Sequence, residues 1–346
     1  MAGCITLGLT LFWITITLCG RKEVESFVRR HNKNYKAGKV IWKAGISSVI
    51  NYDDPASMKN HLGVNDTIKN HPKFNKYNNA NQTSHRNLQT SNLTTSSFDL
   101  RTKYPQCSSI SVIRNQGPCG SCWAVAAGSI LSDRYCIKYS TLTVTKQKFL
   151  SYEDILEGCP GEICGYGSNS CNGGMLDGGF QFALKYGVCT GDNFGNTTFC
   201  KPYLISPYAY PPFVTFPNNT QCNPAYSVPY LSDKIKITSV SYIWGQTPSA
   251  TEASIIAALN ARGSIIVYVD VYKDFFSYLS GIYQKNSSIY YGGHALRLIG
   301  YGVENGIKYW LGANSWGPYW GMQGTIKIQR GVNMINIESF AVEPIF

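Results

Sequence analysis

The 346-residue sequence has few charged residues, and outside its N-terminus it has no long run that is apolar enough to cross a membrane. The second absence excludes a multi-pass membrane protein. Charged residues make up 15% of the chain and hydrophobic residues 44%, a balance that excludes a disordered or low-complexity chain. The length suffices for two ordinary domains with a sizeable core.

The shortage of acidic relative to basic residues lies mainly in residues 21–93. Residues 21–93 hold 13 Lys and Arg against 5 Asp and Glu, a net of +8, whereas residues from 94 onward hold 18 against 15, a net of +3. The total of +11 therefore belongs largely to the N-terminal part. No basic stripe interleaved with aromatic residues accompanies it, so we expect no nucleic-acid partner.

Residues 1–20 contain no charge and carry an apolar run from Ile5 to Leu18, followed by Arg21 and Lys22. This pattern predicts a secretory signal peptide, although it lacks a basic start and its cleavage site is only approximately small-x-small. The alternative is an uncleaved signal anchor. Four threonines make the run a poor membrane helix, so we expect no stable membrane insertion.

Ten of the twelve cysteines follow the signal, which favours an oxidising compartment. Independently, six glycosylation sequons indicate passage through the secretory pathway. They begin at Asn65, Asn81, Asn92, Asn196, Asn218 and Asn286. We therefore expect a glycoprotein of the secretory pathway.

Composition divides the chain into a signal (1–20), a pro-segment (21–93) and a mature domain (94–346). The pro-segment is polar and rich in Asn and Lys, with little apolar periodicity beyond Val40 to Ile50. It leads into the Ser/Thr/Asn-rich run 87–97, which is typical of an exposed, cleavable linker. No internal repeat is present.

The mature part predicts helices first and strands afterwards. Helices are expected at 122–138, after Ser151 with Asp154 three residues on, at 175–186, and from a cap at Ser249 with Glu252 to Gly263. Strands are expected at 265–271, 295–301, 307–312 and 325–329. This order predicts an α+β fold with a helical half (94–205) and a β half (206–346) meeting at a cleft.

Histidine is almost absent from the mature part, because four of the five histidines precede residue 94. His294 is therefore the only imidazole there for acid–base chemistry. Cys122 ends a glycine-rich loop where the first helix begins, and a helix N-terminus favours the nucleophilic thiolate. Taken singly, His294 could be a core histidine and Cys122 one half of a disulfide.

Four further motifs accompany Gln116. Cys119-Gly-Ser-Cys-Trp123, Cys171-Asn-Gly-Gly174, Gly293-His-Ala295 and Asn314-Ser-Trp-Gly317 resemble, in order, those of papain-like cysteine peptidases. The resemblance runs from about Phe98 to the C-terminus. Within that family it is closest to cathepsin B, on stretches such as Gly302–Gly306 and Ile337–Ser339. It implies a helical left domain, a β-barrel-like right domain and a zymogen.

The resemblance also implies roles for the site residues. Cys122 would be the nucleophile and His294 its proton carrier, acting through an acyl-enzyme. Asn314 would orient the imidazole and Trp316 would shield that hydrogen bond. The Gln116 amide would complete an oxyanion hole. Gly173 and Gly174 would offer backbone to the substrate.

Disulfide pairing is likewise taken from the resemblance. It suggests the pairs Cys107–Cys136, Cys119–Cys171, Cys200–Cys222 and Cys159–Cys164. With the nucleophile Cys122 set apart, Cys189 is then left unpaired. The sequence has no metal-ligand cluster and no phosphate loop, so we expect no metal and no cofactor. Expected partners are protein and peptide substrates, the chain's own pro-segment as inhibitor, and cystatin-type inhibitors. Acidic vesicles of lysosomal or vacuolar type, or secretion, are the expected destinations.

Two alternatives compete with peptidase activity. A catalytically silent binding protein on the same scaffold is disfavoured because no motif residue is replaced. An acyl transferase of transglutaminase type usually orients its imidazole with Asp, whereas this chain has Asn314.

Two specificity predictions follow. The stretch between Cys200 and Cys222 has no histidine, so the anchor that cathepsin B uses for dipeptide release from a C-terminus is missing and endopeptidase action is expected. Phe340 stands where cathepsin B carries an acidic residue. This favours hydrophobic over basic P2 side chains, unless Phe340 lies in the core of the β half.

Overall fold

The computed structural model describes residues 12–64, 69, 97–141, 146–165, 171–207, 220–243 and 248–346, with the backbone alone for 12–19 and 248–250. Most of the predicted signal and of the linker 87–97 lies outside these residues. The helices are α1 (Phe12–Lys36), α2 (Pro55–Lys59), α4 (Leu100–Lys103), α5 (Cys122–Tyr139), α6 (Tyr152–Gly158), α7 (Gly161–Cys164), α8 (Gly178–Lys185), α9 (Tyr230–Asp233) and α10 (Pro248–Arg262). The strands are β1 (Trp42–Ala44), β2 (Phe98–Asp99), β3 (Ser239–Ile243), β4 (Ile265–Tyr272), β5 (Tyr278–Tyr283), β6 (Tyr290–Glu304), β7 (Ile307–Ala313), β8 (Thr325–Gln329) and β9 (Ala341–Ile345).

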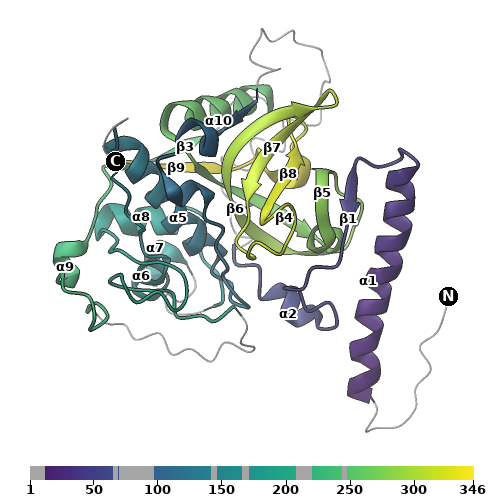
Figure 1. Ribbon diagram of the computed structural model, residues 1–346, viewed down its shortest axis with the longest axis horizontal. Coiled ribbons are helices and arrows are strands. Elements are labelled where there is room, and N and C mark those ends of the chain that lie inside the picture. Colours follow the sequence, from purple (N-terminus) through teal and green to yellow (C-terminus); the bar gives the residue numbers. More distant parts are fainter. Residues whose placement is uncertain are drawn as a thin grey trace.

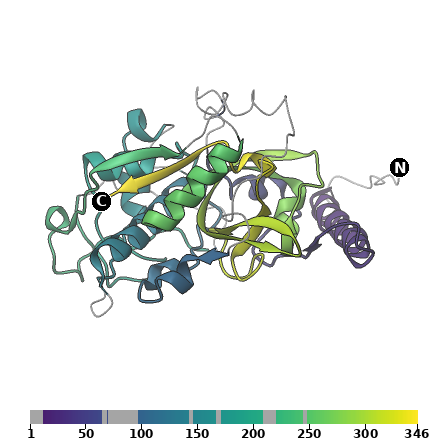
Figure 2. The ribbon, with the colours of Figure 1, turned by 90° about the horizontal axis from the view of Figure 1, so that it is seen from above.

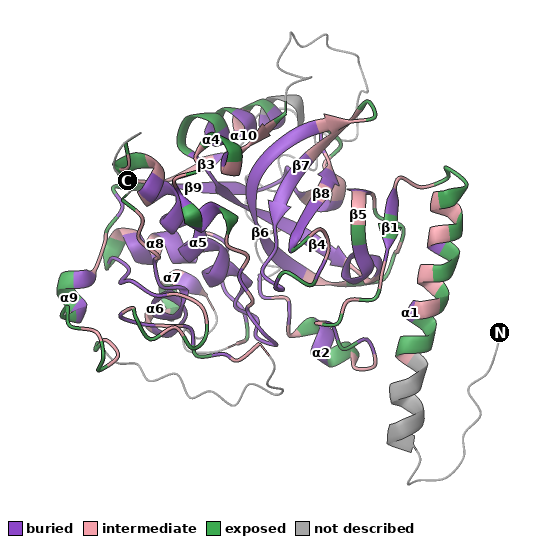
Figure 3. Cartoon of the chain, in the orientation of Figure 1, coloured by how far each residue is buried: buried purple, intermediate pink, exposed green. Residues whose placement is uncertain are grey.

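Helix α5 is the centre of the helical half. Its alanines and large apolar residues occupy nearly every face, and 14 of its 18 residues are buried (Figure 3). It packs against α6 and α8 on one side and against β6 on the other (Figure 1). The predicted helix at 122–138 is thus confirmed, and its burial explains why its apolar residues form no single stripe.

The strands form one sheet in the order β1-β5-β8-β7-β6-β4-β9-β3, with β2 added to β6. The predicted mixture of a helical half and a β half is confirmed. The sheet, however, is open: in the described residues no pairing joins β1 to β3, so it is not a closed barrel. Strands β3 and β9 leave the right-hand strands and run beneath α10 toward the helical half (Figures 1 and 2).

The predicted helices and strands are confirmed where the capping residues and the hydrophobic period indicate the same element. The Ser151 hydroxyl accepts from the Asp154 amide at 3.0 Å at the start of α6. Strands β4, β6, β7 and β8 lie where expected, although β6 is much longer than predicted. Helix α8 begins three residues later than expected, and α10 begins at Pro248, so Ser249 lies inside the helix.

The pro-segment contains a helix that its composition did not predict. In α1, Val24 and His31 are buried, and Phe27 and Val28 pack against the main core. These positions follow the i, i+3, i+4, i+7 spacing of an amphipathic helix. The stripe was overlooked because it is short and ends in a histidine. The first helix therefore lies along the edge of the β half, beside β1 (Figure 1).

Strand β1 makes the pro-segment part of the sheet. It pairs antiparallel with β5, and the Trp42 indole N–H donates to the Gln284 carbonyl at 2.9 Å. His31 Nε2 lies 3.0 Å from the Trp42 carbonyl oxygen and connects α1 to β1. These contacts attach the pro-segment to the β half through specific hydrogen bonds and strand pairing.

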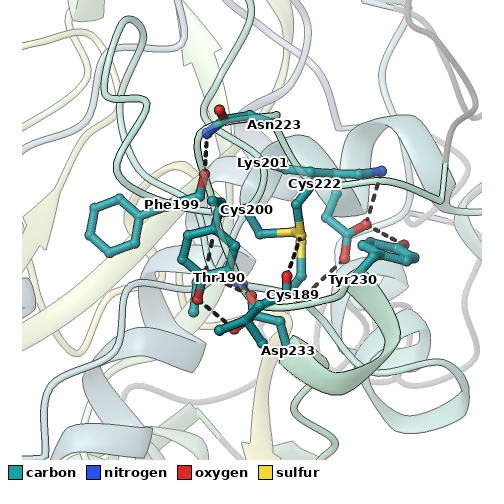
Figure 4. The surroundings of a disulfide bond; sticks show 12 residues. Cys189, Thr190, Phe199, Cys200, Lys201, Cys222, Asn223, Tyr230 and Asp233 are labelled. Carbon is teal, nitrogen blue, oxygen red and sulfur yellow. Dashed lines mark hydrogen bonds and ion pairs between the residues drawn. A yellow bond between two sulfur atoms is a disulfide. The ribbon is translucent and has the colours of Figure 1, made fainter.

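The described residues contain four disulfides, and they are the four that the resemblance suggested: Cys107–Cys136, Cys119–Cys171, Cys159–Cys164 and Cys200–Cys222. Among the described residues Cys122 and Cys189 are free thiols. Cys189 lies beside the Cys200–Cys222 bond and Asp233, and burial raises its pKa well above the usual value (Figure 4). The thiol there is therefore protonated and unreactive at neutral pH.

Candidate active site

Cys122 is the first residue of α5 and is completely buried. Ser121 precedes it, and the Ser121 hydroxyl is 2.7 Å from the Tyr203 hydroxyl, which fixes the loop that leads into the helix. Burial raises the pKa of the Cys122 thiol to about 12, while backbone N–H groups of Ala295 and Gly63 oppose that rise. The thiol is thus neutral in this form of the protein.

His294 lies on β6, opposite Val269 of β4. Its Nε2 is 2.8 Å from Asn314 Oδ1, so with a proton on Nε2 the imidazole donates to the amide oxygen. The other ring nitrogen, Nδ1, is buried and has no partner among the described residues. Burial lowers the pKa of His294 to about 4, against the opposing effect of Asn314. The imidazole is therefore neutral as well.

Trp316 covers the histidine. Its ring centroid is 5.0 Å from that of His294, and the indole also stacks on Phe276 with the centroids 5.2 Å apart. The indole is 1% exposed, so water has little access to the bond between His294 and Asn314. The resemblance implies this shielding role for Trp316, and the role stays a prediction.

Gln116 points its side-chain amide into the same site. Nε2 donates to the His61 carbonyl at 3.1 Å and to the Cys119 carbonyl at 2.7 Å. The Ser315 hydroxyl donates to Gln116 Oε1, and this contact orients the amide. Sequence reasoning did not single out Ser315 beyond its place in the Asn-Ser-Trp motif. The Gln116 N–H groups are occupied by carbonyls in this form.

Residues 63 and 64 of the pro-segment bond to the backbone of the mature domain on both sides of the site. Gly174 N–H donates to the Gly63 carbonyl at 2.9 Å, and Val64 N–H donates to the Gly293 carbonyl at 3.2 Å. Gly63 approaches Gly120 so closely that a Cβ would lie 2.0 Å from the Gly120 oxygen. A side chain at position 63 would therefore push the segment away from the loop before Cys122.

Glycine is also required in the mature domain, at residues 173 and 174. Gly173 has φ +98°, and a Cβ on Gly174 would lie 2.5 Å from the Trp123 ring. The two glycines thus let the pro-segment at Gly63 and the Trp123 ring of α5 both approach this backbone closely.

The His61 carbonyl accepts from both Gln116 and the Trp316 indole, each at 3.1 Å. These two donors come from separate motifs of the mature domain. The role of residues 61–64 was missed because nothing in their sequence marks them: His61 was counted only among the histidines of the pro-segment. Their function appears only once the chain is folded.

Phe340 is 5% exposed and belongs to the core cluster that includes α5. Its ring centroid is 5.9 Å from that of Tyr242, and its carbonyl accepts from the Tyr268 N–H at 3.1 Å. It lies next to β4, the strand that pairs with the His294 strand, and is largely covered.

Comparison with known families now identifies the chain. Residues 94–345 match the family model described as papain family cysteine protease. The chain belongs to this family. It is 39% identical over 258 residues to cathepsin B-like cysteine proteinase 4 of Caenorhabditis elegans, covering 71% of this chain and 73% of that relative. A gut-specific cysteine proteinase of the same organism is 39% identical over 248 residues, 71% of each chain. The protein is thus a cathepsin B-like cysteine peptidase.

Solved structures agree. The chain resembles procathepsin B S9 of Trypanosoma congolense with a TM-score of 0.70 and 26% identity, covering 93% of this chain and 98% of that one. The digestive procathepsin L 3 of Tenebrio molitor larvae shares the fold, with a TM-score of 0.66 and 17% identity over 99% and 95% of the two chains. Both neighbours are pro-forms. Within the described residues, no helix is both long and apolar enough to span a membrane.

Proposed function

We propose that the mature enzyme cleaves peptide bonds with Cys122 as nucleophile and His294 as the group that holds and returns its proton. The observation that carries this is the imidazole held through Nε2 by Asn314 with Nδ1 left unpartnered. A histidine fixed in this tautomer offers Nδ1 as the base. When the pro-segment leaves, water enters and the burial that keeps both groups neutral is relieved, which permits the thiolate–imidazolium pair.

Charge that develops on the substrate carbonyl would be stabilised by the Gln116 amide and the Cys122 backbone N–H. In the zymogen the same amide donates to the His61 carbonyl. The pro-segment thus acts as the inhibitor by using donors and backbone positions that a substrate needs. Pro-form structural neighbours support the assignment as a zymogen.

Endopeptidase action is the proposed mode. The stretch between Cys200 and Cys222 offers Lys201 as its single basic residue, and Lys201 lies 3.3 Å from Glu157 in a buried ion pair. Lys201 is therefore not placed to bind a C-terminal carboxylate. Residues 208–219 of this stretch lie outside the described part.

Hydrophobic P2 preference remains a proposal. Phe340 and Tyr268 belong to one core cluster with Val64 of the pro-segment, and burying an aliphatic P2 side chain against them once the pro-segment has left would contribute about 1.5–3 kcal/mol. Phe340→Glu should raise the acceptance of Arg at P2 relative to Leu. An unchanged ratio of kcat/KM would place the ring outside the pocket.

Destination and further partners are also proposed. The predicted signal, the sequons and the disulfides favour the secretory pathway, with acidic vesicles or secretion as end points and cystatin-type proteins as inhibitors. Asn286 bears a sequon in the described part and lies at an exposed position.

A thiol-directed epoxide with peptide mapping tests the catalytic assignment. The mature enzyme should be labelled at Cys122, and His294→Ala should abolish peptide hydrolysis. A silent scaffold would leave Cys122 unlabelled, and a transferase would incorporate amines faster than it cleaves peptides. Cys189, whose thiol is buried, provides the internal control because it should stay unlabelled.

A further inference from the structure

A buried carboxylate lies beside the active-site strand and has no part in the proposed catalysis. Asp270 is on β4 opposite Gly293, the residue before His294, and its side chain is 7% exposed. The Tyr268 hydroxyl donates to Asp270 Oδ1 and the Asn336 amide donates to Oδ2, both at 2.7 Å. Two neutral donors thus hold this carboxylate beside the strand that carries His294.

The pro-segment places a cation on this carboxylate. Lys69 Nζ is 3.0 Å from Asp270 Oδ1 and donates to the Tyr290 hydroxyl at 3.0 Å. The ammonium also lies over two aromatic rings, 4.3 Å from the centroid of Tyr290 and 5.9 Å from that of Tyr268. Burial alone would lower the pKa of Lys69, but Tyr290 and Asp270 together raise it above its usual value. The cluster therefore stabilises a positive charge.

Activation removes this cation. Lys69 belongs to the segment 21–93, whereas Asp270, Tyr268, Tyr290 and Asn336 all belong to the mature domain. After the segment leaves, Asp270 keeps its two neutral donors but loses the ammonium. A carboxylate with little exposure and no cation is costly, so the mature site favours a new positive charge at the same place.

We propose that Asp270, Tyr268 and Tyr290 form a substrate subsite for a Lys or Arg side chain, which Lys69 fills in the zymogen. The inference rests on the proposed peptidase function and deepens it. A Lys or Arg side chain can place its cation over aromatic faces and on a carboxylate at once, and the Lys69 ammonium does both here.

Tyr268 connects this subsite to the neighbouring apolar wall. Its backbone N–H donates to the Phe340 carbonyl, and its hydroxyl donates to Asp270 at the other end of the side chain. The carboxylate comes from β4 and not from the segment that carries Phe340. A substrate could therefore bind an apolar side chain against Phe340 and a basic one at Asp270. Because Phe340 is the proposed P2 contact, the basic residue is expected on the N-terminal side of the scissile bond.

A peptide panel on the activated full-length enzyme tests the subsite. Arg is compared with citrulline, its uncharged isostere, at P1, P2 and P3 in turn, with Leu at P2 when another position varies. At one position kcat/KM should be at least about tenfold higher for Arg. Asp270→Asn should remove most of that ratio while changing cleavage of the citrulline peptides less than about twofold. Glu304→Gln, which removes a carboxylate paired with Lys327 far along β6, should change nothing.

The outcomes separate the two proposals. An Arg preference at P2 that Asp270→Asn removes supports the subsite and overturns the hydrophobic P2 proposal. If cleavage is normal but no position shows an Arg preference sensitive to Asp270→Asn, the subsite is wrong and the peptidase assignment stands. A second variant, Tyr290→Phe, tests the subsite even if Asp270→Asn fails to fold. It removes one hydroxyl from the partly exposed side of the subsite and should lower the ratio of kcat/KM for Arg over citrulline by a smaller factor.

Discussion

At the residue scale, the site combines groups whose charge depends on what covers them. Burial moves the pKa of Cys122 up and that of His294 down, so both are neutral beneath the pro-segment. The residue types were predictable from sequence because the motifs are compact. Their neutral state was not, because it depends on Gly63 and His61, which reach the site from more than fifty residues away.

Gln116→Ala in the mature enzyme should lower kcat by about 10²–10³ with little change in KM, because the amide would act on charge that develops only in the transition state. Steady-state kinetics on one peptide substrate provide the measurement. Gln329→Ala, on the far strand β8, is the matched control and should leave kcat unchanged. A fall in Gln116→Ala confined to KM would assign the amide to ground-state binding.

His61 makes docking of the pro-segment dependent on pH. Burial lowers the pKa of His61 to about 4, with a backbone contact at Gly117 opposing the shift, whereas a solvated histidine has a pKa of about 6.5. The released segment therefore binds the proton more tightly. The equilibrium constant for docking of the pro-segment should be largest above about pH 6.5. It should fall by up to about tenfold per pH unit as the pH falls toward 4.

His61→Phe keeps the backbone carbonyl that Gln116 and Trp316 bind, but it removes this titration. Activation rates of the full-length zymogen between pH 4 and 7 should then depend less steeply on pH. Some dependence should persist, because burial also lowers the pKa of His31 and of His294. An unchanged slope would show that His61 stays neutral throughout.

At the element scale, elements that depend on residues close in sequence were predictable, whereas elements that depend on distant residues were not. Helix α5 was predictable because its apolar residues are contiguous, and α6 because its cap is local. Strand β1 has three residues and exists only by pairing with β5 more than 230 residues later. The subsite at Asp270 was likewise hidden, since a single acidic residue inside an apolar strand gives no local signal.

Helix α5 is attached to the sheet by a buried ion pair. Asp133 accepts from Arg297 Nη1 at 3.0 Å and from the hydroxyls of Ser109 and Ser264 at 2.7 Å each. Both charged side chains are at most 4% exposed. Asp133→Ala leaves the Arg297 charge buried without its partner, which should destabilise the fold by about 3–5 kcal/mol.

Urea unfolding of the inactive Cys122→Ala chain, with its disulfides intact, measures this loss. The double variant Asp133→Leu with Arg297→Met should recover most of it, since two apolar side chains then replace the pair. If the double variant is as unstable as Asp133→Ala, the hydroxyls of Ser109 and Ser264 matter more than the charge.

At the scale of the whole molecule, the pro-segment is an integral part of the fold of the zymogen. It supplies an outer helix, an edge strand and the chain through the active site, and these contacts bury Trp42 and His61. The predicted division at residue 94 is a change in composition, whereas the sheet includes strands from both sides of it. Composition indicated the division but not β1, which pairs with β5 of the predicted mature domain.

Trp42 is the side chain on which this docking most depends. It is completely buried, its ring lies 3.9 Å from His31 and 5.2 Å from Tyr283, and its N–H is bonded to Gln284. Trp42→Ala should cost about 3–5 kcal/mol of docking free energy, a factor of more than about 10² in the closed-to-open ratio. The uncleaved zymogen, which is expected to be inactive in the wild type, should then hydrolyse a small peptide measurably.

Lys43→Ala changes an exposed neighbour on β1 and is the control, so this zymogen should stay inactive. Complete silence of Trp42→Ala, with uncleaved chains verified by mass, would mean that residues 61–64 hold the cleft closed without help from the edge strand.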